Sequence, residues 1–599
     1  MVDTHLASPD AADAGQAAAG SAMPPAETRR LLTAGLLILG AAGLLRGLWL
    51  TADPPTTFTT VGIVWHDEGA WVHNARNRAL WGTWRTDAWN PVFVSPVFTA
   101  LEYGAFSLFG VGTWQARTVP LLSGLAAIGF LGIGLAAAGG RRAALFGMVL
   151  LATNYVFVMW NRAALMESTM TALIVGAWAM YAAAAARPAL GMAAGALAVL
   201  AWFTKAAAAF FIGALLLDAA LTLALAWHGG LRNLLGIDRP SPAAVRVALM
   251  TCAGAAACAG MAAVLFVIPY WDEYRFYNWQ MSVTRKPSYS LQALFDRATW
   301  IPIVHDTFTR MWGTLVAASV AVLALAGRWR TASPAERLLV LWLALALLEL
   351  TVHDSGNERR YVMLVPALIA LAALAVTAPG TLACGSRSRW IAAAAAAPLA
   401  YLIVGSLVRV LWLADVKAGH LRLPVRTALL GTVLATGLVA WTWPRLAHWL
   451  TAQRIPVRVA AILCAIVAAG DLFQYWQWAA TRTFLNVEAS RAVGRLLPAG
   501  TLVHGKLANG LSLENRIRPI FVGRGFGNYA DRTTRDDVPF VLTYTAPYVG
   551  YEGDVIQDVL DAHRCHTVIA SFEVAETAAG HDRAALMNKF GPSCEPSGR

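Results

Sequence analysis

Charged side chains recur at the ends of long apolar stretches in this 599-residue chain. The acids are Asp67 and Glu68, which precede the second apolar stretch, and Glu167, at the start of a later one. The cations are Lys205, between two apolar stretches, and the pair Arg359-Arg360. Charges beside a membrane are costly unless they are paired or solvated, so such residues are functional candidates. Carboxylates can accept a proton from a hydroxyl, and Lys and Arg can bind phosphate.

The apolar stretches that position these residues indicate a polytopic α-helical membrane protein. The chain is 57% hydrophobic and only 14% charged, whereas soluble proteins carry about 25% charged residues. Runs of roughly 20 apolar residues can cross a bilayer as a helix, and we expect about 13 such spans. The expected spans are residues 31–50, 115–138, 143–161, 167–186, 189–203, 206–227, 246–269, 311–327, 336–352, 361–378, 390–413, 426–443 and 457–478.

Three regions follow from this division of the chain. Residues 1–30 are rich in Ala, Asp and Pro without an apolar period, which predicts a disordered cytoplasmic tail. Residues 31–478 form the transmembrane region, with residues 51–114 as its first outer loop. Residues 479–599 alternate strand-length apolar segments with helical periodicity, which predicts a small extracytoplasmic α/β domain. Within the first outer loop, residues 92–110 are apolar but interrupted by Pro96 and Glu102, so we expect a surface helix there.

The distribution of basic residues predicts an N-terminus inside and a C-terminal domain outside. Arg29-Arg30 and Arg141-Arg142 lie in short loops with few acids, as is typical of cytoplasmic loops. Outer loops also carry basic residues, so the bias is modest. An odd number of spans then places the C-terminal domain and the candidate acids on the extracytoplasmic side.

The net charge of +12 does not indicate a nucleic-acid partner, because the basic residues are scattered between apolar stretches. Four of the six cysteines lie in or beside apolar segments. Cys565 and Cys594 lie in the polar tail and could form a disulfide outside the cytoplasm. No cysteine or histidine spacing is typical of a zinc site.

Several short motifs occur in order along residues 31–375, although no single one is specific. They are His66-Asp67-Glu68-Gly69, Asn90-Pro91 … Ser95-Pro96, Phe109-Gly110-Val111-Gly112 … Ala116-Arg117, Arg141-Arg142, Met166-Glu167-Ser168, Phe203-Thr204-Lys205 and Arg360-Tyr361 … Val365-Pro366-Ala367. The ordered set resembles the GT-C superfamily of glycosyltransferases. It is most similar to the branch with protein O-mannosyltransferases, aminoarabinose transferases and lipopolysaccharide galacturonosyltransferases. In that family the second acidic site is often Asp, so Glu167 is a departure that weakens a metal-site assignment.

The resemblance implies an inverting glycosyltransferase in a bacterial inner membrane. It would move a sugar from a polyprenyl-phosphate donor to an extracytoplasmic glycan, lipid or protein. Asp67 would be the general base, with Glu68 as the alternative. Glu167 would orient the acceptor or hold a divalent metal. Lys205 and Arg359-Arg360 would bind the donor phosphate; no other cofactor is expected.

Structural interpretations of the same residues compete with the catalytic ones. Asp67 and Glu68 could cap a helix that begins near them, and Glu167 could cap a span. Lys205 could be an interfacial lysine whose head extends to water, and Arg359-Arg360 could pair with Glu358 or lipid headgroups. A secondary transporter or lipid flippase is the alternative function, although we find no internal repeat typical of transporters. A non-catalytic scaffold would place Asp67 far from Lys205.

Overall fold

The computed structural model describes residues 25–55, 64–235, 237, 239–284, 306–353, 358–377, 389–452, 455–525, 527–545, 553–577 and 580–591. Residues 1–24 of the expected N-terminal tail lie outside these ranges. The first described helix, α2, begins at Pro25.

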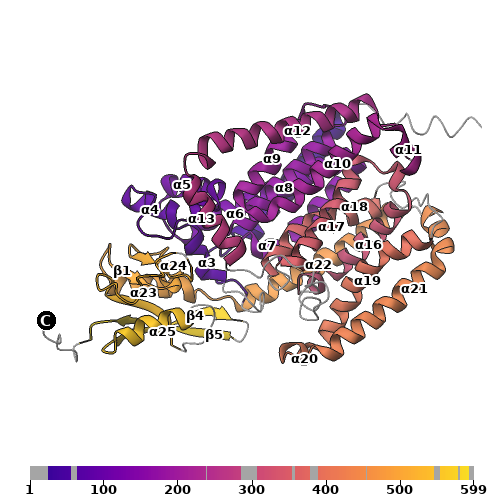
Figure 1. Cartoon of the computed structure of the whole chain (residues 1–599). Coiled ribbons are helices and arrows are strands. Elements are labelled where there is room, and N and C mark those ends of the chain that lie inside the picture. The colour runs from indigo at the N-terminus through magenta and orange to yellow at the C-terminus, as the bar shows by residue number, and fades with distance from the viewer. Residues whose placement is uncertain are drawn as a thin grey trace, which may run out of the picture.

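A bundle of apolar helices forms most of the molecule (Figure 1). Its main helices are α2 (Pro25–Gly47), α6 (Thr113–Thr153), α8 (Met166–Ala183), α9 (Leu190–Thr204), α10 (Ala209–Trp227), α12 (Pro242–Ala262), α16 (Trp312–Gly327), α17 (Pro334–His353), α18 (Val365–Thr377), α19 (Arg389–Leu411), α21 (Arg422–Ala452) and α22 (Val457–Thr481). Short elements between them are α7 (Tyr155–Trp160), η2 (Ala206–Ala208), α11 (Gly229–Leu235), η3 (Ala263–Val267), α13 (Trp271–Trp279), η4 (Gln280–Thr284), α15 (Asp306–Arg310), η6 (Trp329–Thr331), η7 (Glu358–Leu364) and α20 (Leu413–Lys417). The expected polytopic helical architecture is confirmed.

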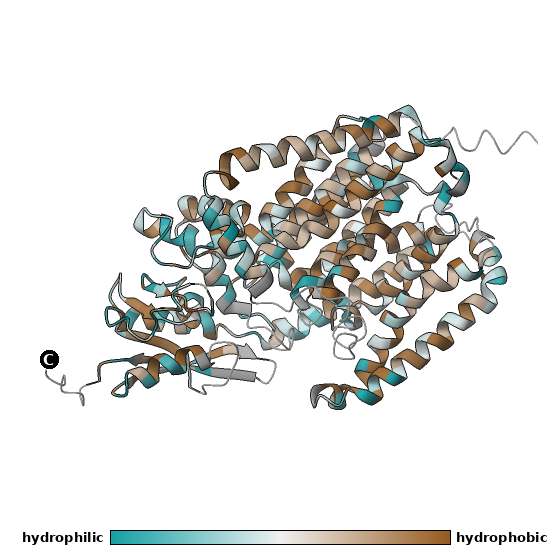
Figure 2. Cartoon of the chain, in the orientation of Figure 1, coloured by the Kyte–Doolittle hydropathy of each residue, from teal (hydrophilic) through white to brown (hydrophobic). Residues whose placement is uncertain are grey.

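Every expected span falls on one or more of these helices. In the described part of the chain, eight helices are long and apolar enough to cross a membrane. The long helix α6 contains one expected span and the first part of the next, which continues into α7, and its backbone turns at Gly140, where φ is +78°. A left-handed backbone of this kind favours glycine, so Gly140 permits the turn before Arg141. Figure 2 shows hydrophobic residues along the bundle helices, with hydrophilic ones around α4, in the C-terminal domain and at helix ends.

Helix α18 lies at the centre of the bundle, because 89% of the most apolar stretch in residues 359–377 is buried. The corresponding share for Arg29–Gly47 is 11%, which places α2 at the periphery. The segment leading into α18 therefore carries Arg359 and Arg360 toward the interior.

The first outer loop folds into α3 (Val64–Trp71), α4 (His73–Trp81), η1 (Pro91–Phe93) and α5 (Pro96–Phe109). Helix α5 has 14 residues, or ~21 Å, which is shorter than the ~30 Å hydrocarbon core of a bilayer. It buries Phe98, Glu102 and Phe106 but exposes Leu108. These properties fit the expected surface helix.

The C-terminal region is a small α/β domain at the end of the bundle where α3 and α4 lie (Figure 1). Its elements are α23 (Leu485–Leu496), β1 (Leu502–His504), α24 (Lys506–Gly510), β2 (Arg518–Ile520), β3 (Phe540–Tyr544), α25 (Gly553–Ala562), β4 (Thr567–Thr577) and β5 (Gly580–Asn588). The sheet order is β2-β1-β3-β5-β4. Strand β1 runs parallel to β2 and β3, whereas β5 is antiparallel to β3 and β4. The expected α/β character is confirmed.

Asp53 fastens this domain to the end of α2. Its Oδ2 accepts hydrogen bonds from the Leu485 amide (2.7 Å) and the Thr483 hydroxyl (2.7 Å), and its Oδ1 accepts from the Asn486 amide (3.2 Å). Asp53 thus satisfies N–H groups at the N-terminus of α23, which lacks a side-chain cap of its own. The carboxylate of Asp53 therefore joins the bundle to the C-terminal domain.

Candidate active site

The site is a line of four charged side chains at the end of the bundle nearest the C-terminal domain. Asp67 in the first turn of α3 accepts a hydrogen bond from Nη1 of Arg359 (2.5 Å). Nε of Arg359 lies 3.2 Å from Oε1 of Glu167, at the start of α8. The same Oε1 also binds Nζ of Lys205. The structure thus brings together two acids and two cations that lie up to 292 residues apart in sequence.

The four side chains are largely shielded from solvent. The exposed fraction is 17% for Asp67, 19% for Arg359 and 2% for Glu167. Charges in such surroundings interact more strongly than charges in water. Two carboxylates and two cations balance one another, so the group forms a neutral network that an additional anion could rearrange.

Lys205 is positioned by a break between two helices. Its backbone is extended (φ −160°, ψ 127°) between α9 and η2. The hydroxyl of Ser95, at the N-terminus of α5, donates to the carbonyl of the preceding Thr204 (2.5 Å). The surface helix is therefore tied directly to the segment that carries Lys205.

Glu68 points into a different environment from Asp67. Its carboxylate accepts two hydrogen bonds from Arg117, from Nε at 2.8 Å and Nη2 at 2.7 Å, and a third from the Ala164 amide at 2.6 Å. Arg117 also donates to the carbonyls of Leu50 and Ala52. Glu68 is thus engaged in joining α3 to α6 and to the segment before α8.

Arg360 is likewise separated from its neighbour in sequence. Its Nη1 lies 3.5 Å from Oε1 of Glu349 on α17. The candidate phosphate-binding pair therefore divides: Arg359 contacts Asp67 and Glu167, whereas the ion pair of Arg360 is to a bundle helix.

Arg117 is the residue of this region whose role was not inferred from sequence. It belonged to a motif opening the second span, but no function followed from its position. The available signal is a cation at the start of the second expected span, which directly follows the outer loop that carries the acidic pair. Arg162, near the start of α8, donates through Nη1 to the carbonyls of Arg46 and Leu48 and so covers the C-terminal end of α2.

A divalent metal does not fit the residues around Glu167. Lys205 and Arg359 already occupy Oε1 of Glu167, and their positive charges would repel a cation. Among the described residues no group of three or more His, Cys, Asp or Glu could hold a metal ion.

The cysteines of the C-terminal domain are described only in part. Cys565 is disulfide-bonded, but Cys594 lies outside the described residues. The Cys565–Cys594 pairing stays a prediction.

Comparisons with known proteins place the fold. No family model matches the chain, and no curated protein matches its sequence. The apo structure of ArnT from Cupriavidus metallidurans is similar to this chain over 96% of its length and 100% of ArnT, with 16% identity and a TM-score of 0.50. The structure of ArnT from the same organism bound to undecaprenyl phosphate matches 96% of this chain and 99% of ArnT, with 16% identity and a TM-score of 0.46. The apo structure of the Archaeoglobus fulgidus oligosaccharyltransferase matches 86% of this chain and 69% of its own chain, with 12% identity and a TM-score of 0.40.

ArnT is an aminoarabinose transferase of the GT-C superfamily. The similarity to apo ArnT extends over both whole chains, including the C-terminal domain. The GT-C fold expected from the ordered motifs is therefore confirmed, and the chain is an integral membrane protein of this architecture.

Proposed function

We propose that this protein is an inverting glycosyltransferase that moves a sugar from a polyprenyl-phosphate donor to a hydroxyl-bearing acceptor. The observation that carries the proposal is the contact line Asp67–Arg359–Glu167–Lys205 within a GT-C fold. It places a candidate base beside two cations that suit a phosphate. The site lies at the end of the bundle nearest the C-terminal domain, on the side that the sequence predicts to be extracytoplasmic.

The leaving group explains why one base is enough. A phosphate monoester has a second pKa near 6, so it departs as an anion without a proton donor. Glycosidases need a second carboxyl because their leaving group is poor. Here the acceptor oxygen attacks the anomeric carbon as the bond to the phosphate oxygen breaks. The hydroxyl proton passes to Asp67, and a single displacement inverts the anomeric centre.

Lys205 and Arg359 receive the negative charge that develops on the departing phosphate. Both bind carboxylates in the structure. The donor phosphate is a diester with one negative charge, equal to that of a carboxylate, and it would compete for the same hydrogen-bond donors. Its negative charge grows as it departs as a monoester, which strengthens these contacts. When Arg359 turns toward the phosphate, it releases Oδ2 of Asp67, which can then accept the hydroxyl proton. Donor binding would thereby prepare the base.

Glu167 orients the other groups and the acceptor. Its Oε1 holds Lys205 and Arg359, whereas its Oε2 is buried and makes no hydrogen bond to the described residues. A buried acceptor without a partner is unfavourable. A substrate hydroxyl that donates to Oε2 would remove this cost and fix the substrate beside Asp67.

The location within a membrane protein follows from the donor. At ~0.8 kcal/mol per buried CH₂, a long prenyl chain remains in the bilayer. The enzyme must therefore bring its charged site to the membrane boundary. For a bacterial protein we place it in the inner membrane, with the acceptor being a glycan, lipid or protein of the cell envelope.

The proposal is tested by deleting the gene and complementing with wild-type protein or Asp67→Asn. Mass spectrometry of envelope glycans and lipids should show a glycosylated species that disappears on deletion and returns only with wild type. The mass difference would identify the sugar. If Asp67→Asn, present at the wild-type level, restored the species in full, the proposed base would be wrong. A flippase would instead move intact lipid-linked sugar across reconstituted vesicles without forming a new glycoside.

A further inference from the structure

We propose that the C-terminal domain positions Asp67 by gripping the opposite face of the helices that carry it. Gly69, His73 and Arg76 follow one another at intervals of four and three residues, so they lie along one face of α3 and α4. Asp67 lies two residues before Gly69 and thus about 200° around the helix. The inference rests on the proposed function, because it assigns the domain a part in the same reaction.

At Gly69 the backbone of α3 lies directly against the backbone of α24 in the C-terminal domain. A Cβ atom at this position would lie 1.8 Å from the carbonyl oxygen of Asn509 in α24. No side chain can fit into that space. The α24 backbone is itself fixed by Gly505 at the end of β1, where φ is +117° and a Cβ would lie 2.5 Å from the carbonyl oxygen of Leu542. The backbone two residues after Asp67 therefore rests directly on the sheet domain.

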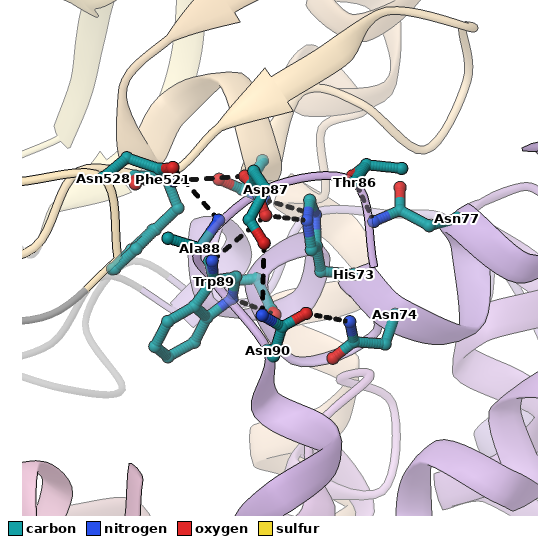
Figure 3. Close-up of polar contacts among 12 residues, drawn as sticks. His73, Asn74, Asn77, Thr86, Asp87, Ala88, Trp89, Asn90, Phe521 and Asn528 are labelled. Atoms are coloured by element: carbon teal, nitrogen blue, oxygen red, sulfur yellow. Dashed lines mark hydrogen bonds and ion pairs between the residues drawn. The ribbon is translucent and has the colours of Figure 1, made fainter. Parts of the chain in front are cut away.

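His73 continues the contact through a buried network (Figure 3). Its Nδ1 lies 3.1 Å from Nδ2 of Asn509, and its Nε2 lies 3.0 Å from Oδ1 of Asp87. Asp87 accepts a further hydrogen bond from Nδ2 of Asn528 (3.2 Å). The Ala88 amide donates to Oδ1 of Asn528 (3.1 Å). Two asparagines of the C-terminal domain thus bind the two ends of a histidine–aspartate pair in the first outer loop.

Arg76 makes the most demanding contact. Its side chain is fully buried, and it donates to the carbonyls of Ser512 (3.2 Å), Asn515 (3.0 Å) and Ile517 (3.0 Å). A buried charge is costly unless hydrogen bonds compensate it. The conformation of α4 with Arg76 inside is therefore favourable only while the turn at residues 512–517 is in place.

The opposite face of α3 carries Asp67 to Arg359. Asp67 and Gly69 belong to the same short helix, and α4 with His73 and Arg76 follows it after one residue, so displacement of these rear contacts shifts the carboxylate. Misplacement of a reacting group by about 1 Å can lower a rate by about 10²-fold. Asn509 and Arg76 are accordingly positioning residues, and the domain contributes to the rate even without touching the sugar.

The test uses full-length protein in lipid nanodiscs with the variants Asn509→Ala and Arg76→Lys. An ammonium group cannot reach three carbonyls as a guanidinium does. The matched control is Arg491→Lys, because Arg491 lies in the C-terminal domain with Asn509 but its side chain is 58% exposed. Three quantities are measured: amide hydrogen exchange, affinity for undecaprenyl phosphate, and the rate of sugar transfer in membrane vesicles with their own lipid-linked donors.

We expect faster exchange in α3 with unchanged exchange in β1 and β3, affinity within about twofold of wild type, and a transfer rate lower by about 10- to 100-fold. Arg491→Lys should match wild type in all three. Unchanged transfer by both variants would overturn the positioning role, while Asp67→Asn in the same vesicles reports separately on the proposed reaction. If Arg76→Lys also accelerates hydrogen exchange in the sheet, that variant disturbs the whole domain and Asn509→Ala carries the test alone. Faster exchange in α3 of Asn509→Ala together with a normal transfer rate would contradict the inference.

Discussion

Arg117 holds Glu68 with two hydrogen bonds, of 2.8 and 2.7 Å, so the carboxylate next to Asp67 in sequence is committed to the scaffold. Asp67 contacts Arg359 instead. Because the two adjacent acids have different partners, we expect replacement of Asp67 to affect the transfer rate and replacement of Glu68 to affect stability.

Replacing Asp67 should abolish turnover without unfolding the protein. Asp67→Asn keeps the size and hydrogen-bonding capacity of the side chain but removes its basicity. The transfer rate should fall by roughly 10²–10⁴-fold, the usual contribution of a general base. Rates in membrane vesicles, with thermal unfolding as a control, measure this. Near-normal transfer by folded Asp67→Asn would move the base elsewhere.

Replacing Glu68 should act on stability. Glu68→Gln leaves the guanidinium of Arg117 buried without its carboxylate; both side chains are only 3% exposed. Removing one partner of a buried ion pair costs about 3–5 kcal/mol. The midpoint of thermal unfolding in nanodiscs should drop well below that of Asp67→Asn. Equal midpoints for the two variants would argue that Arg117 finds another partner.

The two neighbouring arginines should differ in donor binding. Arg359→Gln and Lys205→Gln each remove a cation from the contact line. Affinity for undecaprenyl phosphate should weaken by about 10- to 100-fold, because a hydrogen bond to a charged group contributes about 1.5–3 kcal/mol. Arg360→Gln should weaken it far less, since Arg360 pairs with Glu349. A larger effect at Arg360 than at Arg359 would reverse the assignment.

Reporter fusions test the membrane orientation. Alkaline phosphatase fused after Ala480, at the end of α22, should be active if the C-terminal domain is extracytoplasmic. A fusion after His228 should be inactive, because α11 lies at the far end of the bundle from that domain (Figure 1). The opposite pattern would place the candidate site in the cytoplasm.

The C-terminal domain should lose stability in mild acid through His504. Burial, with the nearby charges of Lys589 and Arg535, lowers the pKa of His504 to about 3. Above its ordinary pKa of 6.5 the imidazole is neutral in both states. Between pH 6.5 and 3 only the unfolded chain binds the proton, so folding weakens as the pH falls; from pH 6.5 to 5 the loss is about 2 kcal/mol.

Pulse proteolysis of the full-length protein after equilibration in urea at pH 7 and pH 5 measures this dependence. A His504→Gln variant is the control, because glutamine does not titrate in this range and should flatten the pH profile. An equally steep profile in the variant would assign the acid sensitivity to other groups.

The sequence was sufficient for the architecture and for the set of candidate residues. Apolar length and turn residues locate spans, because a helix must match the thickness of the bilayer. The short helix α5 and the α/β tail follow from the same local patterns. Charged residues are only 14% of the chain, so Asp67, Glu167, Lys205 and Arg359 could be selected as candidates, together with Glu68 and Arg360, before any contact was known.

Only the tertiary structure decided between residues that are neighbours in sequence. Asp67 and Glu68, like Arg359 and Arg360, have the same chemistry and differ by one position. Side chains one residue apart on an α-helix point about 100° apart, so the surroundings determine which one meets the substrate. The hydrogen bonds from Arg76 to the C-terminal domain could not be predicted from the sequence either. Its partners are main-chain carbonyls more than 430 residues away. Every residue has such a carbonyl, so the residue types do not indicate which ones accept a hydrogen bond.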